Sequence, residues 1–318
     1  MKNLVRPTTL KVVKKAKDVR INQDRIKEIA REWAKRKIIV PAWPLNFHLR
    51  VRNSRLMLDY LIILDSINFC FWNKDKKWQI TYKNKKYNGY FALSLALKKF
   101  FEENAAKGSL EYFTEISFKE FVSILQGGKD LLFLKKRWQI AKAVSKVLIK
   151  KYGDSENFLK TANQKFSVLV SKIYKELPYF NDLAFYKGEK IYFLKRAQIL
   201  AADIFGAFRG KGIGKFKDLE HLTCFSDYKT PQILHQFGIL EYSPNLERKI
   251  KNRNTIPRRS NQEIEIRSAT VWAVEHLKEE LEKLGKKFRS FEIDWILWDM
   301  SQKLKIGIPY HLTKTIFY

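Results

Sequence analysis

The segment from Leu56 to Ile67 is nearly all apolar. This apolar density is too high for a helix with one solvent-facing side, so we predict a helix that is buried on all sides. Such a helix must be surrounded by other elements, and a chain of 318 residues with 45% hydrophobic content can supply that core. The segment therefore favours a mainly α-helical fold.

Further helix signals follow along the chain. The segment from Ile21 to Lys37 has helical periodicity, and its expected buried face consists of Ile26, Ile29, Ala30 and Trp33. Ser117 and Glu120 have the spacing of a capping box, and Ser290 is expected to cap the last helix. The remaining helices are expected at about 118–125, 131–151, 157–176, 195–207 and 263–285.

Only one β element is expected. Residues from Trp78 to Tyr82 alternate with period two, and a turn at Asn84 and Lys85 predicts a small hairpin. Residues 250–262 are polar and basic and predict an exposed loop, whereas residues 1–20 are basic with little periodicity and predict a loose lead-in. Without an internal repeat or a low-complexity linker, residues 21–318 are expected to form one domain.

Charge and cysteine content narrow the class of protein. The chain has 62 Lys and Arg against 33 Asp and Glu, a net charge of +29, which would attract polyanions. The basic residues are spread over the whole chain, so this charge is compatible with a nucleic-acid partner or with a surface that tolerates lysine without any partner. It also suits an anionic substrate, either a polymer or a mononucleotide. Two cysteines, with no CxxC pair and no HExxH, suit a reducing cytosol without a structural metal. We expect a cytoplasmic protein, because no apolar run reaches the length of a membrane span and no signal-peptide core is present.

The nine residues from Cys224 to Gln232 contain the strongest candidate for chemistry. Thr230 is predicted to be an N-cap, Pro231 the first helical residue and Gly238 the end of the helix. Asp227 would then lie just before a helix N-terminus, where the helix dipole stabilises a carboxylate. Such a group can face a developing cation or orient a water molecule. The alternative is that Asp227 only caps a turn.

Three other segments have side chains suited to a ligand. Asn68 lies beside three aromatic side chains, Phe69, Phe71 and Trp72. These aromatic side chains could stack on a flat heterocycle or simply form a core cluster. Lys195 begins a helix and could hold a phosphate or be a solvated helix end. Asp294 and Trp298 are spaced i, i+4 and share a helix face, which could equally be an amphipathic edge. The glycine-rich run from Gly210 to Lys215 lacks the spacing of a nucleotide-triphosphate loop and predicts a turn.

Seven segments follow one another along the chain: Asn68–Trp72, Tyr192–Gln198 with Asp203, Gly210–Gly212, Phe225–Gln232, Glu263–Arg267, Asp294–Asp299, and Pro309–His311 with Ile316–Tyr318. In this order they resemble the queuosine salvage proteins, the queuosine 5′-phosphate N-glycosylase/hydrolase family, from about residue 40 onward. The resemblance implies a single helical domain related to helical DNA glycosylases, acting without metal or organic cofactor. It implies hydrolysis of queuosine 5′-monophosphate to release the base queuine for reinsertion into tRNA, by a protein expected to be a monomer.

Carried onto this chain, the resemblance assigns roles residue by residue. Asp227 would be the catalytic carboxylate. The base site would be formed by His48, Asn68, Phe71, Trp72, Phe225, Tyr228 and Asp294. The 5′-phosphate would be held by Lys195, His311 and Lys314. The family often has Arg where Leu312 stands, so the phosphate contacts are the part of the pattern from which this chain departs.

Two other functions remain open at the level of sequence. A nucleic-acid base glycosylase would use a similar fold and carboxylate on a base flipped from a polymer, and the net charge favours it. A non-enzymatic RNA-binding protein would use lysines and exposed aromatic side chains. The glycosylase predicts steeply salt-dependent binding to duplex or single strands. The RNA-binding protein predicts that Asp227→Asn leaves function intact.

Overall fold

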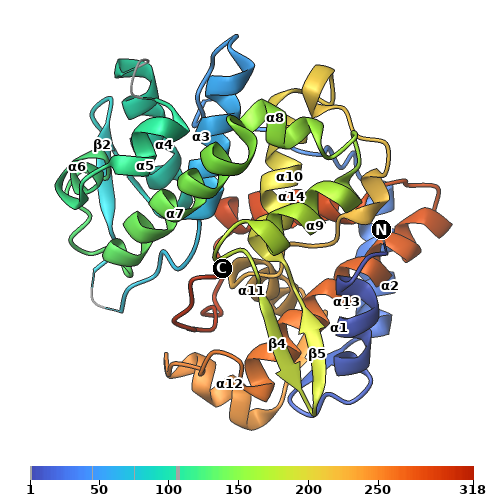
Figure 1. Ribbon diagram of the computed structural model, residues 1–318. Coiled ribbons are helices and arrows are strands. Elements are labelled where there is room, and N and C mark those ends of the chain that lie inside the picture. Colours follow the sequence, from blue (N-terminus) through green and yellow to red (C-terminus); the bar gives the residue numbers. More distant parts are fainter. Residues whose placement is uncertain (1, 45, 75, 105–107) are drawn as a thin grey trace.

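The computed structural model describes residues 2–44, 46–74, 76–104 and 108–318. Helices dominate the described residues, and the only sheets among them are three antiparallel pairs, so the predicted mainly α fold is confirmed (Figure 1). The helices of the first half are α1 Val5–Val13, α2 Gln23–Lys35, α3 Ser54–Ser66, α4 Gly89–Glu103, α5 Leu110–Glu115, α6 Phe118–Ile124 and α7 Leu134–Tyr152. Those of the second half are α8 Ser155–Lys160, α9 Phe166–Glu176, α10 Lys195–Ala207, α11 Lys229–Gln236, α12 Pro244–Lys251, α13 Asn261–Lys283 and α14 Ser290–Lys303.

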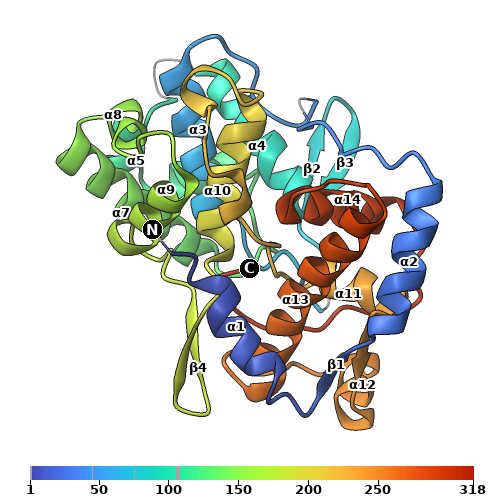
Figure 2. The same ribbon diagram turned by 90° about the vertical axis from the view of Figure 1, so that its right-hand side faces the viewer.

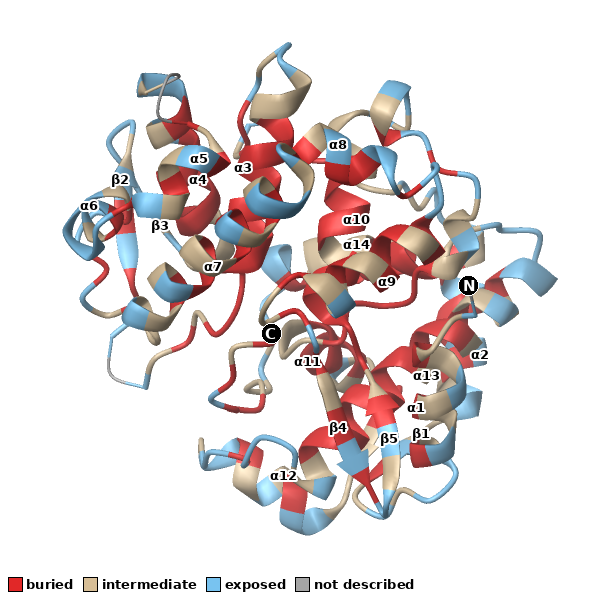
Figure 3. Ribbon diagram, in the orientation of Figure 1, coloured by how far each residue is buried: buried red, intermediate tan, exposed pale blue. Residues whose placement is uncertain are grey.

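Helix α3 is the centre of the larger hydrophobic core. The Asn53 side chain accepts a hydrogen bond from the Leu56 amide at 3.0 Å and caps the helix, as a short polar side chain does at this position. Every residue from Met57 to Ser66 is buried, which confirms the predicted buried helix. Helices α4, α7, α8 and α10 pack around it (Figures 1 and 3).

A second core forms around α13. Helices α1, α2, α11 and α14 pack against it, and the four residues expected on the buried face of α2 are all buried there (Figure 2). Strand β1, Val19–Ile21, pairs with β6, Leu240–Tyr242, and so ties the beginning of the chain to the segment that follows α11.

The expectation of a loose lead-in over residues 1–20 was wrong. Helix α1 buries Val5 and Val12, and the Trp272 indole donates a hydrogen bond to the Thr9 hydroxyl at 3.1 Å. Arg6 forms an ion pair with Glu275 of α13 at 2.9 Å. The segment is basic and has few apolar residues, and these pack against α13, which is distant in sequence. The contacts could therefore not be predicted from the segment itself.

The predicted hairpin and capping box are confirmed. Strands β2, Gln79–Tyr82, and β3, Lys85–Asn88, pair in antiparallel register around a turn in which Asn84 has a positive φ of 60°. The box before α6 has both of its expected hydrogen bonds. A second hairpin, β4 Leu183–Tyr186 with β5 Glu189–Tyr192, was not predicted.

Some predicted boundaries differ from the structure. The helix expected over 157–176 is divided into α8 and α9 by Asn163 and Gln164, which both have positive φ. The start of α9 is capped by a residue that is distant in sequence. The Asp218 carboxylate accepts hydrogen bonds from the Phe166 amide at 2.6 Å and the Ser167 amide at 3.0 Å. Ser290 is the first residue of α14 and not its cap.

Helix α14 connects the two cores. Phe291 belongs to the core around α3, whereas Ile293, Ile296 and Leu297 belong to the core around α13. On its remaining face, Trp298 contacts Tyr90 and Phe91 of α4, with ring centroids 5.9 and 5.4 Å apart. Of the helices that the structure describes, none is long and apolar enough to cross a membrane.

Candidate active site

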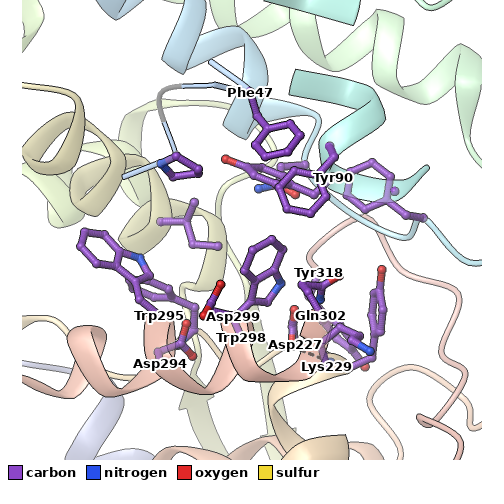
Figure 4. A pocket seen from close by; sticks show the side chains of 18 of the residues that line it. Phe47, Tyr90, Asp227, Lys229, Asp294, Trp295, Trp298, Asp299, Gln302 and Tyr318 are labelled. Carbon is purple, nitrogen blue, oxygen red and sulfur yellow. Dashed lines mark hydrogen bonds between the residues drawn. The ribbon is translucent and has the colours of Figure 1, made fainter. Parts of the chain in front are cut away.

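A cavity of about 370 Å³ lies where the two cores meet (Figure 4). This volume is within the usual range for small-molecule sites. Its walls are mostly aromatic, with a small set of carboxyl, amide and amino groups among them. The lining comes from parts of 41–47, 68–72, 88–91, 195–203, 225–229 and 294–302, together with Lys77, Tyr310 and Tyr318.

Asp227 caps α11 at one end of the cavity. Its Oδ1 accepts hydrogen bonds from the amides of Lys229 at 2.7 Å and Thr230 at 2.9 Å. The carboxylate therefore lies at the positive end of the helix, as predicted, and is fixed there by two backbone donors. The predicted helix start was two residues late, because α11 begins at Lys229 and not at Pro231. The Thr230 hydroxyl instead donates to Asp294 at 3.4 Å.

Asp294 of α14 contacts the loop that carries Asp227. Its Oδ1 accepts hydrogen bonds from the Cys224 thiol and the Phe225 amide, both at 3.0 Å. Burial raises the pKa of Asp294 to about 7, and the nearby negative charge of Asp227 adds to this effect. Asp294 thus holds the loop before α11 against α14 and lines the cavity as a carboxyl that titrates near neutrality.

Lys195 is a buried cation beside these carboxyl groups. Its Nζ lies 3.5 Å from the Asn68 carbonyl oxygen. Burial lowers the pKa of Lys195, while Asp227 and Asp65 act in the opposite direction and favour the charged ammonium. The ammonium of Lys195 therefore offsets part of the negative charge of the nearby carboxyl groups.

A buried ion pair supports the start of α10. Asp182 accepts from the Lys195 backbone amide at 3.2 Å and from Arg267 Nη2 at 2.6 Å. The Arg267 guanidinium lies over the rings of Phe193 and Tyr318, 3.9 and 4.3 Å from their centroids. Because Tyr318 lines the cavity, this pair links the helix that carries Lys195 to the cavity wall.

Aromatic side chains form the two long walls. Trp295 and Trp298 project from α14, and Phe47 and Tyr90 lie opposite them (Figure 4). Such walls can stack on a flat heterocycle, while the acidic end near Asp227 can act on a bond attached to it. The arrangement suits a ligand with an aromatic ring joined to a polar group that undergoes the chemistry.

Comparison with known proteins decides the family. A family model described as "Queuosine salvage protein" matches residues 47–318, which is most of the chain. The chain belongs to the queuosine salvage protein family.

Curated relatives in this family cover nearly the whole chain. A protein of Sphaerobacter thermophilus named queuosine 5′-phosphate N-glycosylase/hydrolase is 38% identical over 98% of this chain and 96% of its own length. A protein of the same name from Dictyostelium discoideum is 33% identical over 99% and 98%, and one from Bos taurus is 31% identical over 88% and 87%. The resemblance found from seven short segments is thereby confirmed.

Most of the residues expected at the queuosine salvage site lie together in the cavity. Those that line it are Asn68, Phe71, Trp72, Lys195, Phe225, Asp227, Tyr228 and Asp294. They come from segments up to 226 positions apart, Asn68 and Asp294 being the extremes (294 minus 68). The motifs identified in the sequence therefore contain side chains that the fold brings together in the cavity.

Three expected residues are not among the lining residues. His48 is buried behind the wall, where its ring stacks on Trp43 with centroids 4.0 Å apart. His311 is also buried, and burial lowers its pKa to about 3, so it is neutral and supplies no positive charge for a phosphate. Lys314 is exposed and lies outside the lining.

Several lining residues were not expected at the site. Lys229 and Asp299 stand in segments that the family resemblance singled out, so reading those segments in full would have found them. Asp203 and Tyr90 line the cavity from α10 and α4. Tyr90 carried no signal, because α4 was not predicted. Among the described residues, no group of three or more His, Cys, Asp and Glu side chains is placed to hold a metal ion.

Proposed function

We propose that this protein hydrolyses the N-glycosidic bond of queuosine 5′-monophosphate and releases queuine for salvage into tRNA. The relatives named queuosine 5′-phosphate N-glycosylase/hydrolase support the reaction. The observation that carries the proposal in this chain is the fixed carboxylate of Asp227 at the end of an aromatic cavity.

In this proposal Asp227 acts on the ribose. Breaking an N-ribosyl bond develops positive charge on the sugar, as in glycoside hydrolysis generally. The two amides that hold Oδ1 leave Oδ2 to face the ribosyl cation or to orient the attacking water. Because the carboxylate is held before the reaction begins, no reorganisation is needed as the charge develops.

The base would lie against a second group of aromatic side chains that line the cavity. Phe71, Trp72, Phe225 and Tyr228 supply faces for stacking, and Asn68 supplies a polar edge. The Asn68 amide nitrogen already donates to Asp65 at 3.2 Å, which fixes the amide so that its oxygen can accept from the ligand. A flat 7-deazaguanine ring with several N–H donors matches this combination.

The 5′-phosphate is assigned to Lys229 and Lys77, with Lys195 deeper in the cavity. Burial lowers the pKa of Lys229, and the positive charge of Lys77 adds to this effect while Asp227 opposes it. Two ammonium groups close enough to repel each other form a site that a dianion would stabilise. Lys195 has Asp227, Asp65 and Asp294 around it, whereas Lys229 has Asp227 as its neighbouring carboxylate, so a phosphate beside Lys229 and Lys77 would meet less repulsion.

The test is to incubate the purified protein with queuosine 5′-monophosphate and to follow queuine and ribose 5-phosphate by mass spectrometry. Stoichiometric appearance of both products is expected. The unphosphorylated nucleoside should be a poorer substrate if the two lysines bind the phosphate. Absence of both products from a folded sample would contradict the proposal.

The same preparation distinguishes the other function classes. A nucleic-acid base glycosylase would release base from an oligonucleotide and show steeply salt-dependent binding. We expect no release of base from tRNA that contains queuosine. We also propose that the protein acts as a monomer in the reducing cytoplasm, where its two free and buried cysteines would stay reduced.

A further inference from the structure

A chain of buried polar groups leads away from the cavity beside α10. The Tyr90 hydroxyl donates to Asp203 Oδ2 at 3.2 Å and lies 3.5 Å from His48 Nε2. On the other side of the ring, His48 Nδ1 lies 3.0 Å from the Tyr60 hydroxyl, which reaches the Ser94 carbonyl oxygen at 3.4 Å. Asp203 is the member of this chain that carries an acidic proton and lines the cavity. The reaction proposed above does not yet use any of these groups.

The hydrogen bonds that connect Asp203, Tyr90, His48 and Tyr60 can run in either of two directions. Burial lowers the pKa of His48 to about 3, so its ring is neutral and has one N–H and one acceptor nitrogen. With Asp203 ionised, Tyr60 donates to His48, His48 to Tyr90, and Tyr90 to the carboxylate. With Asp203 protonated, the carboxyl donates to Tyr90, Tyr90 to His48, His48 to Tyr60, and Tyr60 to the Ser94 carbonyl.

This reversal means that both protonation states of Asp203 keep their hydrogen bonds. A buried carboxyl with a single fixed donor would be stabilised in one state only. Here, gain or loss of the proton rotates two hydroxyl groups and changes the tautomer of one ring, and the two hydroxyls, the two ring nitrogens and the carboxyl each keep a partner. The arrangement is what a carboxyl needs if it gives up and regains a proton in each catalytic cycle.

The charged groups around Asp203 bring its titration near neutrality. Burial raises the pKa of Asp203 to about 7, while the Tyr90 hydroxyl, the Trp43 indole and the charge of Lys195 act in the opposite direction. Asp65 and Tyr60 of α3 are the other titratable groups on which the charge of Asp203 acts, and His48 is reached through Tyr90. Burial and the charge of Asp203 raise the pKa of Asp65, so ionisation of one carboxyl disfavours ionisation of the other.

The leaving base sets a requirement that Asp227 cannot meet. An expelled 7-deazaguanine carries the electron pair of the broken bond, and it lacks the N7 that could take up a proton beforehand. Asp227 is held as an acceptor by two backbone amides beside a cation, which suits a base or a stabiliser of positive charge and not an acid. A second group must therefore supply the proton.

We propose that Asp203 is the general acid that protonates the leaving base, with Tyr90 and His48 as its positioning residues. This inference rests on the proposed function. As the C1′–N bond breaks, its electron pair goes to the base, and the base takes the proton of Asp203. Water bonds to C1′ and gives its proton to Asp227. After the products leave, Asp227 releases a proton to solvent and Asp203 takes one up.

Asp294 is the alternative carboxyl, and its contacts argue against it. Its Oδ1 accepts from a thiol and an amide of the loop that carries Asp227 and from the Thr230 hydroxyl at the start of α11. Three donors on one oxygen fix the Asp294 side chain between α14 and this segment, which gives it a structural task. Asp203 has a hydroxyl partner that can either donate or accept.

The decisive experiment compares two leaving groups. Asp203→Asn should lower kcat on queuosine 5′-monophosphate by about 10²–10⁴-fold. On 4-nitrophenyl ribofuranoside 5-phosphate, whose phenolate leaves without a proton, the loss should be less than about 10-fold, whereas Asp227→Asn should lose activity on both. Undiminished turnover of the natural substrate by Asp203→Asn, or equal losses on both substrates, would overturn the assignment.

A second variant keeps the inference testable if Asp203→Asn does not fold. Tyr90→Phe removes the hydrogen bond that lowers the pKa of Asp203, so the alkaline limb of the pH–rate profile should move to higher pH. An unchanged or lowered limb would contradict the role of Asp203. If the wild-type protein does not release queuine at all, it is the proposed function that fails; if it does and these variants behave like wild type, only this inference fails.

Discussion

Single residues in this protein take their properties from neighbours that are distant in sequence. Asp227 was recognised from its own segment because the helix signal beside it is local. The environment of Lys195 could not be predicted, because the carboxyl groups around it come from α3, the loop before α11 and α14. Local pattern therefore identified the catalytic candidate, whereas the charge balance of the cavity required the fold.

The phosphate assignment can be tested with charge-removing substitutions. Lys229→Gln and Lys77→Gln should each raise KM for queuosine 5′-monophosphate by roughly 10-fold, the loss of about 1.4 kcal/mol of binding. Their effect on the unphosphorylated nucleoside should be small. Steady-state kinetics on both substrates measures this, with Lys314→Gln as the matched control outside the cavity. Equal effects on the two substrates would place the phosphate elsewhere.

Asp294 should make stability depend on pH. Its folded-state pKa of about 7 is above the ordinary value of 3.8, so the folded protein binds more protons between these values. The contribution of Asp294 to stability is therefore present at low pH and is lost as the pH rises to about 7. Asp294→Asn keeps the shape without the charge, so its Tm relative to wild type should rise from pH 5 to pH 8. A difference in Tm that is constant with pH would contradict this environment for Asp294.

At the scale of elements, helices and strands with strong local sequence signals were predicted, and those with weak signals were missed. The capping box of α6 and the alternation of β2 lie within a few residues, and both elements were found. Helices α4, α5 and α12 and the β4–β5 hairpin were missed. The break between α8 and α9 was also missed, because its cap comes from Asp218, more than 50 positions after the residues that it caps.

The distant cap of α9 gives a prediction at this scale. Asp218→Ala removes the acceptor of two backbone amides and should lower the free energy of unfolding by about 0.5–2 kcal/mol. Asp218→Asn retains an acceptor and should lose less. Urea unfolding of both variants measures the difference, and queuine release should be unchanged because Asp218 is remote from the cavity lining. No loss of stability in Asp218→Ala would show that the cap is dispensable.

At the scale of the whole molecule, the cavity depends on two cores held together by α14. One core is built around α3 and the other around α13, and the site lies between them. The sequence predicted the buried helix of the first core and the amphipathic helix of the second. It could not predict how they meet, because contacts such as that between Trp298 and Phe91 join residues about 200 positions apart.

The N-terminal segment should be part of this assembly. The amides of Lys17 and Asp18 donate to the Glu265 carboxylate at 3.0 and 2.6 Å, and Val5 and Val12 of α1 are buried. Deleting residues 1–18 should lower the free energy of unfolding by roughly 3–6 kcal/mol, since each buried valine contributes about 1.5–3 kcal/mol. Denaturant unfolding measures this, with exposed Lys14→Ala as a control expected within about 0.5 kcal/mol of wild type. An unchanged stability would restore the expectation of a loose lead-in.

The proposed role of Asp227 is that of the catalytic carboxylate in hydrolysis of queuosine 5′-monophosphate. A single-turnover measurement of queuine release tests this role most directly. Asp227→Asn should fold with nearly the same Tm, because the amide oxygen still accepts from the amides of α11. Its rate of queuine release should nevertheless fall by about 10²–10⁴-fold relative to wild type. Release within a few-fold of the wild-type rate, by a folded Asp227→Asn protein, would contradict the account.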